Sequence, residues 1–140
     1  MALKRIGQIL LDLGLIDEQQ LETMVEEQPS RGELLGRVGL ALGFYSEEQL
    51  GEALAEQWGT TFVTLYDREI PAAALATISE PMAQLYRVVP LELQGNRLTI
   101  ATAEPQKIQI ADELRTLLGY DIHVCVATAT EIDKAIEKSF

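Results

Sequence analysis

The sequence has only one cysteine, Cys125, so no disulfide bond can form within its 140 residues. A chain without disulfides is usual in the cytosol, where thiols stay reduced. No apolar run approaches the roughly 18 residues that a membrane span requires. The first residues, MALKRIGQILLDLG, include Asp12 and lack a small-residue cleavage site, which indicates a helix and not a signal peptide. We therefore expect a cytoplasmic protein with no transmembrane segment.

Basic residues are also scarce in this chain. Eleven Lys and Arg stand against 22 Asp and Glu, which gives a formal net charge of -11. Nucleic acids and anionic lipids are bound through dense Lys and Arg contacts to phosphate, so this charge argues against DNA, RNA or a lipid surface as a partner. One small phosphate ligand, held by a few local donors, stays compatible with it. Hydrophobic residues make up 47% of the sequence, as in ordinary globular domains.

Motifs for catalysis are missing as well. The single histidine, His123, lies in the alternating segment DIHVCVA, two residues before Cys125 on the same strand face. No further ligand motif accompanies these two residues, so the sequence does not show the spacing of a metal site. The chain contains no Gly-Lys dipeptide and therefore no GxxxxGK[ST] phosphate-binding loop. No nucleophile elbow and no paired carboxylates stand out. We therefore predict no enzyme activity, no catalytic residue, no metal site and no cofactor.

The sequence does contain an internal repeat. Residues 5–28 align with residues 34–57, and nine of the 24 positions are identical. Similarity at a fixed period indicates a duplicated supersecondary unit. The identical pairs are Gly7/Gly36, Leu11/Leu40, Leu13/Leu42, Gly14/Gly43, Glu18/Glu47, Gln20/Gln49, Leu21/Leu50, Glu27/Glu56 and Gln28/Gln57.

Each repeat is predicted to form a short helix, a glycine turn and a second helix. A glycine after the last apolar residue of the first helix is typical of a left-handed C-cap. An N-cap residue with glutamine three positions later is typical of a capping box. These residues are Gly14, Asp17 and Gln20 in the first repeat, and Gly43, Ser46 and Gln49 in the second. The breaker-rich segment PSRGE, residues 29–33, is predicted to link the two repeats.

Capping does not explain the glycines near the start of each repeat. Gly7 and Gly36 lie in the first turns of their helices, where glycine costs about 1 kcal/mol relative to alanine. Either a neighbouring helix or a bound planar or phosphorylated ligand that approaches the backbone closely would account for both. Gln28 and Gln57, which end the second helices, are either solvated or local caps, or else they form a matched polar clamp.

The few basic residues gather around the starts of the repeats, at Lys4, Arg5, Arg31 and Arg37. Arg5 directly precedes a predicted helix N-terminus. Free N–H groups, the helix dipole and a guanidinium group together favour an anion at such a place. The alternative is that Arg5 is a solvated surface charge.

The remaining sequence predicts a small α/β layer with the element order ααββαβα. The segments PAAALATI and EPMAQLYR read as short helices split at Pro81, and VVPLELQGNRLTIATA reads as a hairpin with a Gly-Asn turn. A helix from Pro105 to Gly119, the strand DIHVCVA and a helix with a Thr128/Glu131 capping box follow. The fold class is therefore α+β, with a helical tandem-motif subdomain over residues 1–62 packed on an α/β subdomain over residues 63–140.

The two 24-residue repeats, RIGQILLDLGLIDEQQLETMVEEQ and LLGRVGLALGFYSEEQLGEALAEQ, resemble the tandem motifs of the MshEN domain. That domain is the N-terminal domain of type II secretion and type IV pilus assembly ATPases. The segment YRVVPLELQGNRLTIATAEPQ and the later LGYDIHVCVAT resemble the rest of the domain, so the resemblance covers nearly the whole chain.

The resemblance implies that the repeats bind cyclic di-GMP, with arginine, glutamine and backbone groups on phosphates and guanine edges and with apolar side chains packed on the ligand. Carried over by position, the first repeat supplies Arg5, Ile6, Gly7, Gly14, Leu15, Leu21, Val25 and Gln28. The second supplies Leu35, Gly36, Gly43, Phe44, Leu50, Leu54 and Gln57, with Arg31 and Arg37 as nearby cations.

Three positions depart from the family pattern. Leu34 occupies the arginine position of the second repeat, Gly39 replaces an apolar residue, and Glu104 stands where the family often has aspartate. Two functions follow from the resemblance. The first is a cyclic di-GMP-binding regulatory domain of a secretion or pilus ATPase system. The alternative is a protein-interaction domain without a nucleotide that docks the ATPase domain to an inner-membrane platform protein, which the loss of an arginine at Leu34 favours.

Overall fold

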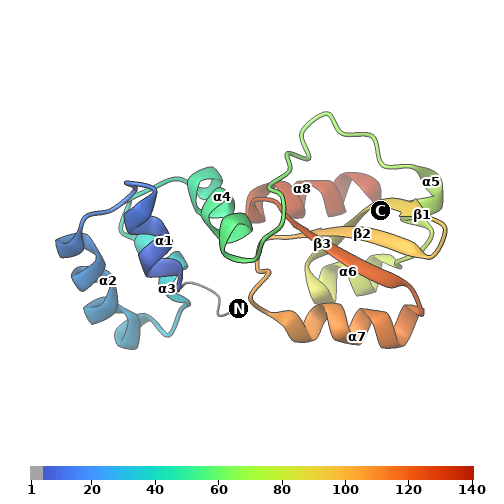
Figure 1. The fold of residues 1–140 in the computed structure, drawn as a ribbon. Helices are drawn as coiled ribbons and strands as arrows, with labels where there is room; N and C mark the ends of the chain where they lie inside the picture. The colour runs from blue at the N-terminus through green and yellow to red at the C-terminus, as the bar shows by residue number, and fades with distance from the viewer. Residues whose placement is uncertain (1–4) are drawn as a thin grey trace. The chain divides into compact units, whose positions relative to one another are not determined.

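The structure, a computed structural model, describes residues 5–140 and divides into two compact units (Figure 1). The first unit ends at Gly59 and the second comprises Thr60–Phe140. Helices make up the first unit, whereas helices and a three-stranded sheet make up the second. The fold is thus mixed α+β, as the sequence predicts.

The first unit consists of the helices α1 (Ile6–Asp12), α2 (Glu18–Arg31), α3 (Leu35–Ala41) and α4 (Glu47–Gln57). The predicted helix, glycine turn and helix occur twice, with the same local geometry. Gly14 and Gly43 have φ of +73° and +78°, values that glycine adopts more readily than other residues. Both predicted capping boxes are present, from Asp17 to Gln20 and from Ser46 to Gln49.

The predicted link over residues 29–33 is wrong in its extent. Helix α2 continues through Pro29 to Arg31 and ends at Gly32, whose φ is +63°. A proline in the last turns of a helix removes one hydrogen bond, here the one to the Val25 carbonyl, and its own φ is already helical. The left-handed glycine therefore ends the helix, and the proline does not.

Helix pairing in the first unit crosses between the repeats. Helix α1 packs against α4, and α2 packs against α3. Neither repeat therefore buries its apolar face alone, and the two must fold together. The buried apolar side chains of this unit are Ile9, Leu10, Ile16, Met24, Val38, Tyr45, Leu50, Ala53, Leu54 and Ala55.

The second unit has the predicted order ααββαβα. Its elements are α5 (Ala72–Leu75), α6 (Glu80–Tyr86), β1 (Val88–Gln94), β2 (Arg97–Thr102), α7 (Ile108–Leu118), β3 (Asp121–Val126) and α8 (Ala129–Ser139). The strand order is β1-β2-β3, with β1 antiparallel and β3 parallel to β2. Helices α7 and α8 cover opposite faces of the sheet (Figure 1), which explains why β1 and β2 are buried on both faces.

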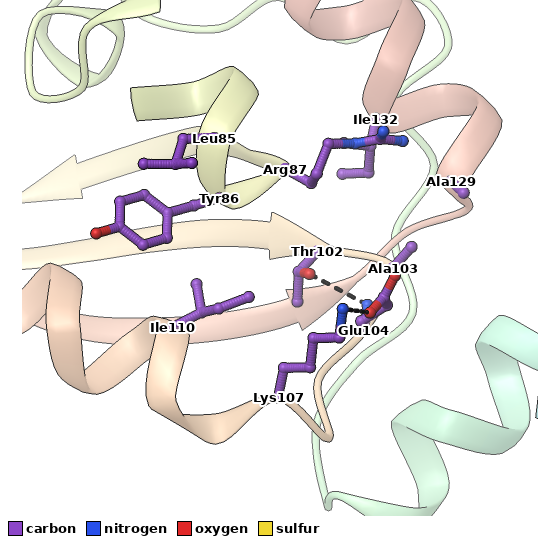
Figure 2. A pocket seen from close by; sticks show the side chains of 10 residues that line it. All are labelled: Leu85, Tyr86, Arg87, Thr102, Ala103, Glu104, Lys107, Ile110, Ala129 and Ile132. Atoms are coloured by element: carbon purple, nitrogen blue, oxygen red, sulfur yellow. Dashed lines mark hydrogen bonds and ion pairs between the residues drawn. The ribbon is translucent and has the colours of Figure 1, made fainter. Parts of the chain in front are cut away.

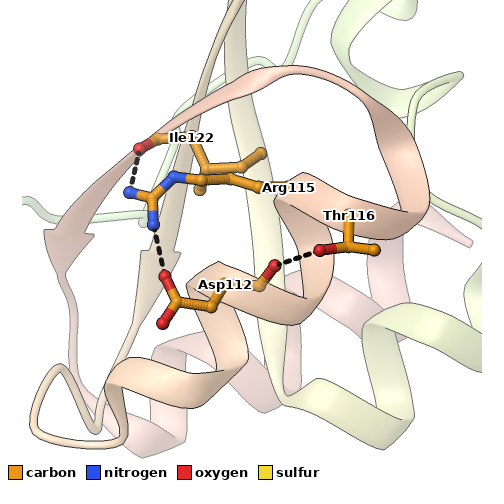
Figure 3. A network of polar contacts seen from close by, with 4 residues as sticks. All are labelled: Asp112, Arg115, Thr116 and Ile122. Atoms are coloured by element: carbon orange, nitrogen blue, oxygen red, sulfur yellow. Dashed lines mark hydrogen bonds and ion pairs between the residues drawn. The ribbon is translucent and has the colours of Figure 1, made fainter.

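Side chains close the outer edge of β3. The Arg115 guanidinium donates to the Ile122 carbonyl at 3.0 Å and is held by Asp112 at 2.8 Å, and Thr116 donates to the Asp112 carbonyl (Figure 3). Further along the edge, the Thr60 hydroxyl donates to the Val124 carbonyl at 2.6 Å. Edge carbonyls that are already bonded offer little to an added strand.

Two local predictions for the second unit need correction. Helix α7 begins at Ile108 and not at Pro105, because residues 104–107 form a turn in which the Lys107 N–H bonds the Glu104 carbonyl at 3.1 Å. The capping box of α8 is only half formed. The Thr128 hydroxyl accepts from the Glu131 N–H, but the Glu131 carboxylate accepts instead from the Leu65 N–H at 2.8 Å.

Candidate functional site

The starts of α1 and α3 meet through a reciprocal contact. A Cβ atom placed on Gly7 would lie 3.7 Å from Leu35, and one placed on Gly36 would lie 3.9 Å from Ile6. Each glycine also lies under the leucine of the second helix in its own repeat, with distances of 3.0 Å to Leu21 and 2.8 Å to Leu50. Neighbouring leucines therefore account for the glycines, and the matched contacts relate the two repeats by a near two-fold axis.

Arg5 and Leu34 hold equivalent places on the two sides of this contact. Each is the N-cap residue of its helix, and neither side chain caps the helix by a hydrogen bond. Arg5 is exposed, and Leu34 is 41% exposed. Helices α1 and α3 have only seven residues each. An anion here would therefore depend on arginine side chains more than on helix dipoles.

The other predicted cations differ in what they contact. Arg31 lies 3.7 Å from the Glu27 carboxylate and 3.8 Å from that of Glu33. Arg37 lies one helical turn after Leu34, so the two side chains share one side of α3. Lys4 lies outside the described residues. Arg37 is therefore the better placed of the two arginines to supply the charge that Leu34 lacks.

The apolar residues of the predicted site differ in exposure between the repeats. Val25 is 52% exposed, while its counterpart Leu54 is 5% exposed. Leu21 is half-buried, while its counterpart Leu50 is 3% exposed. Leu15 and Phe44 are both half-buried in the glycine turns. The first repeat thus presents more apolar surface than the second.

The matched glutamines have local partners. The Gln28 side-chain amide donates to the Glu33 carbonyl at 3.1 Å and so holds the short link before α3. Gln57 also has a partner in the structure. Gln28 therefore acts as a local cap here, which is one of the two alternatives that the sequence left open. An added Cβ at Gly14 or Gly43 would meet nothing within 4 Å, so lack of space does not require glycine at either position. Both glycines are explained by the positive φ of their turns.

The structure explains the glycine at position 39 by a size exchange. A Cβ atom on Gly39 would overlap the Tyr45 hydroxyl and lie 2.6 Å from its Cζ. The equivalent pair in the first repeat is Leu10 and Ile16. The second repeat therefore combines a smaller residue at position 39 with a larger one at position 45. The Tyr45 hydroxyl donates to the Gly36 carbonyl at 2.6 Å, and burial raises the pKa of this tyrosine. Gly39 is therefore a packing requirement of Tyr45.

The sequence model of the MshEN domain matches residues 58–140, which is more than half of the chain. The chain belongs to the MshEN domain family. The repeats, residues 5–28 and 34–57, lie entirely before the matched region, but they are included in similarities that span almost the whole chain.

One such similarity of this MshEN domain is to the structure of MshE with cdg, at 27% identity and a TM-score of 0.90, over 98% of this chain and 99% of that one. Another is to the type IV pilus assembly ATPase PilB of Myxococcus xanthus (strain DK1622), 31% identical over 136 residues, which are 97% of this chain and 24% of PilB. A third is to bacteriophage adsorption protein B of Escherichia coli (strain K12), 35% identical over 103 residues, or 74% of this chain and 14% of that protein. The chain thus spans at most about a quarter of these two full-length relatives.

The histidine of this MshEN domain takes part in a surface network. The His123 Nδ1 atom lies 3.1 Å from the Arg97 guanidinium, and its Nε2 atom lies 3.3 Å from the Asp121 carboxylate. Within residues 5–140, no three His, Cys, Asp or Glu side chains are grouped as a metal ion would need. None of the helices in that range has the length and apolar character for crossing a membrane.

Proposed function

We propose that this MshEN domain is a cyclic di-GMP-binding regulatory domain of a type IV pilus or type II secretion ATPase system. The observation that carries the proposal is the reciprocal contact of the two repeats at Gly7 and Gly36, because a near two-fold face suits a ligand built of two similar halves. The similarity to MshE with cdg, the abbreviation of cyclic di-GMP, supports it across the repeats and the second unit.

In this proposal the two arginines on either side of the contact bind the phosphates. Arg5 takes the first phosphate, and Arg37, one turn beyond Leu34, takes the second. The apolar residues near the helix starts and turns pack on the ligand, with the backbone of the turn and helix glycines beside it and the terminal glutamines at its edges. These residues are Ile6, Leu35, Leu15, Phe44, Leu21, Val25, Leu50, Leu54, Gly7, Gly36, Gly14, Gly43, Gln28 and Gln57.

The leucine at position 34 sets the expected strength of binding. A charge-assisted hydrogen bond contributes roughly 1.5–3 kcal/mol. Its absence lowers the affinity by about one to two powers of ten. If Arg37 reaches the ligand, part of this loss is recovered. In this proposal ATP hydrolysis belongs to the ATPase domain of that system, in the cytoplasm, and the MshEN domain has a regulatory role without chemistry of its own.

Calorimetric titration of cyclic di-GMP tests the proposal. We expect saturable binding that is lost in Arg5→Ala, weakened about tenfold in Arg37→Ala, and strengthened in Leu34→Arg. Arg68→Ala is the matched control, because Arg68 is exposed, lies in the second unit and is no member of the predicted site, so its loss should leave binding unchanged. Saturable binding that survives Arg5→Ala would refute the assigned site.

The second candidate function is a protein-interaction domain without a nucleotide, docking an ATPase domain to a membrane platform protein. Leu34 favours it, as do the engaged amide of Gln28 and the burial of Leu50 and Leu54. This function predicts no heat of binding at millimolar cyclic di-GMP, either in the natural chain or in Leu34→Arg. Binding that appears only in Leu34→Arg would mean that the substitution at position 34 silenced a nucleotide site.

A further inference from the structure

A pocket of the second unit combines an apolar lining with two basic side chains. We call it the α8 pocket, and it lies between the loop before α5, the end of α5 and the last turns of α8. Its volume is about 320 Å³, and its apolar lining consists of Leu65, Ile70, Leu75 and Ala135. Binding pockets have volumes from roughly 300 Å³ upward and mostly apolar walls with a few polar groups. The α8 pocket is therefore large enough to take an apolar side chain together with a charged group.

Hydrogen bonds fix the loop that forms one wall of the α8 pocket. The Leu65 N–H donates to the Glu131 carboxylate on α8 at 2.8 Å, and the Arg68 N–H donates to the Leu65 carbonyl at 3.1 Å. The second bond closes a turn in which Asp67 has a φ of +59°, a value that aspartate adopts more often than most residues. Because the wall is already ordered, a ligand does not have to order it on binding.

The two basic residues of the α8 pocket, Arg68 and Lys138, have no side-chain partner in the part of the chain that the structure describes. Lys138 lies in the last turn of α8, where the helix dipole favours a cation but supplies no acceptor that its ammonium group contacts. The other basic residues of this unit, except Lys134, each contact a polar side chain. These pairs are Arg87 with Asp133, Arg97 with His123, Lys107 with Glu104 (Figure 2) and Arg115 with Asp112.

The charges that line the α8 pocket suit one anion. The two positive charges of Arg68 and Lys138 stand against a single acidic lining residue, Glu69, although the chain as a whole has a net charge of -11. At physiological salt the Debye length is about 8 Å, so the charges of the lining act on a bound group more strongly than distant acidic residues do. One carboxylate beside an apolar group therefore matches this lining.

An exposed aromatic residue adjoins the pocket. Tyr66 lies at the tip of the turn between Leu65 and Arg68, both of which line the pocket, and it is 81% exposed. Tyrosine and arginine are enriched at protein interfaces and carry much of their binding energy. An exposed tyrosine beside an unpaired arginine favours a segment of a partner protein over a free small acid, because a segment can cover both residues.

We propose that the α8 pocket docks an acidic segment of a partner protein. An apolar side chain of that segment enters the pocket, and a neighbouring carboxylate binds Arg68 and Lys138. Tyr66 packs on the same segment outside the pocket. The α8 pocket lies within the second unit and uses no residue of the predicted nucleotide site, so this proposal is independent of nucleotide binding by the repeats.

Three peptides with blocked ends test the proposal. The first contains one leucine followed by one glutamate among small neutral residues, the second has glutamine for the glutamate, and the third has serine for the leucine. We expect the first peptide to give saturable shifts of the backbone amide signals of Leu65, Arg68 and Lys138 in NMR spectra of the whole chain. The other two should bind at least fivefold more weakly, because each lacks one of the two groups that the pocket binds.

The double variant Arg68→Ala, Lys138→Ala should lower the affinity for the first peptide at least tenfold. The matched control is Arg97→Ala, Lys134→Ala, which removes the same charge from exposed positions outside the pocket and should leave the affinity unchanged. An equal loss in both double variants, binding of the second or third peptide as tight as that of the first, or no shift at millimolar peptide would overturn the proposal.

Two other occupants of the α8 pocket would give different results. Hexanoate that binds there as tightly as the first peptide would assign the pocket to a free carboxylic acid. Self-association in sedimentation that Arg68→Ala, Lys138→Ala abolishes would assign it to a second copy of this chain. Either result would overturn the partner segment as the occupant.

Discussion

The pair Gly39 and Tyr45 allows a sharp test of how the repeats are packed. We predict that neither residue can be exchanged alone for its counterpart in the first repeat, but that both can be exchanged together. The single variants are Gly39→Leu and Tyr45→Ile, and the double variant reproduces the pair Leu10 and Ile16. The side chain that each change adds or removes occupies the same volume, between α3 and the turn before α4.

The expected magnitudes follow from the contacts. Gly39→Leu drives a side chain into the ring of Tyr45, which is only 7% exposed, so overpacking costs about 3 kcal/mol or more. Tyr45→Ile leaves a cavity and removes the hydrogen bond to Gly36, a loss of about 3 kcal/mol. In the double variant the leucine fills the cavity and is the better helix former by about 0.8 kcal/mol. We expect a total cost near 1 kcal/mol and therefore a favourable coupling of about 5 kcal/mol.

Urea unfolding of the four proteins measures this coupling, with Trp58 at the end of α4 as a fluorescent reporter and circular dichroism as a second probe. Gly39→Leu combined with Tyr66→Ile is the control cycle, because Tyr66 is 81% exposed and lies in the other unit. Its effects should add. If the effects of Gly39→Leu and Tyr45→Ile also add to within about 0.5 kcal/mol, the size exchange between the repeats is refuted.

Three further predictions concern single contacts. Gly36→Ala should lower the free energy of unfolding by about 1 kcal/mol, because the added Cβ would lie 2.8 Å from the buried Leu50. Gly7→Ala should be nearly neutral, because the half-buried Leu21 can move away from the added Cβ. The urea midpoints of the two variants test this difference. Burial raises the pKa of Tyr45, so the unfolded state loses the hydroxyl proton at a lower pH than the folded state. The free energy of unfolding should therefore fall as the pH rises above about 10. In Tyr45→Phe the contribution of this tyrosine to the fall should be absent when unfolding is measured against pH. Thr128→Ala should cost about 1 kcal/mol through the lost cap of α8, and Thr128→Ser should restore it; equal thermal midpoints for all three proteins would contradict this role.

Features that depend on neighbouring residues were predictable from the sequence. The turn glycines Gly14 and Gly43, the capping boxes at Asp17 and Ser46, and the Gly95 hairpin all occur as predicted. Each of these features is completed within about five residues, so its physical cause is visible in a short stretch of sequence. The duplication was visible for the same reason, because both copies repeat the same local signals.

The errors arose where a local signal competed with a partner from elsewhere. The carboxylate of Glu131 fits a capping box, but the backbone of Leu65 takes its hydrogen bond. Pro105 suits the start of a helix, but it is buried in the turn that leads from β2 into α7. Pro29 resembles a helix breaker, but near the end of α2 it costs only one hydrogen bond.

The predicted site likewise combines features that local sequence identifies with contacts that only the packing of distant residues creates. Their positions in the motif identified Arg5, Gly7 and Gly36 as a group, and local rules placed them at helix starts. The contact that joins the repeats, from Gly7 to Leu35 and from Gly36 to Ile6, arises only when α1 packs beside α3. The same holds for the fit between Gly39 and Tyr45. Short-range hydrogen bonds follow from the order of residues, whereas shared volume depends on which distant side chains the fold brings together.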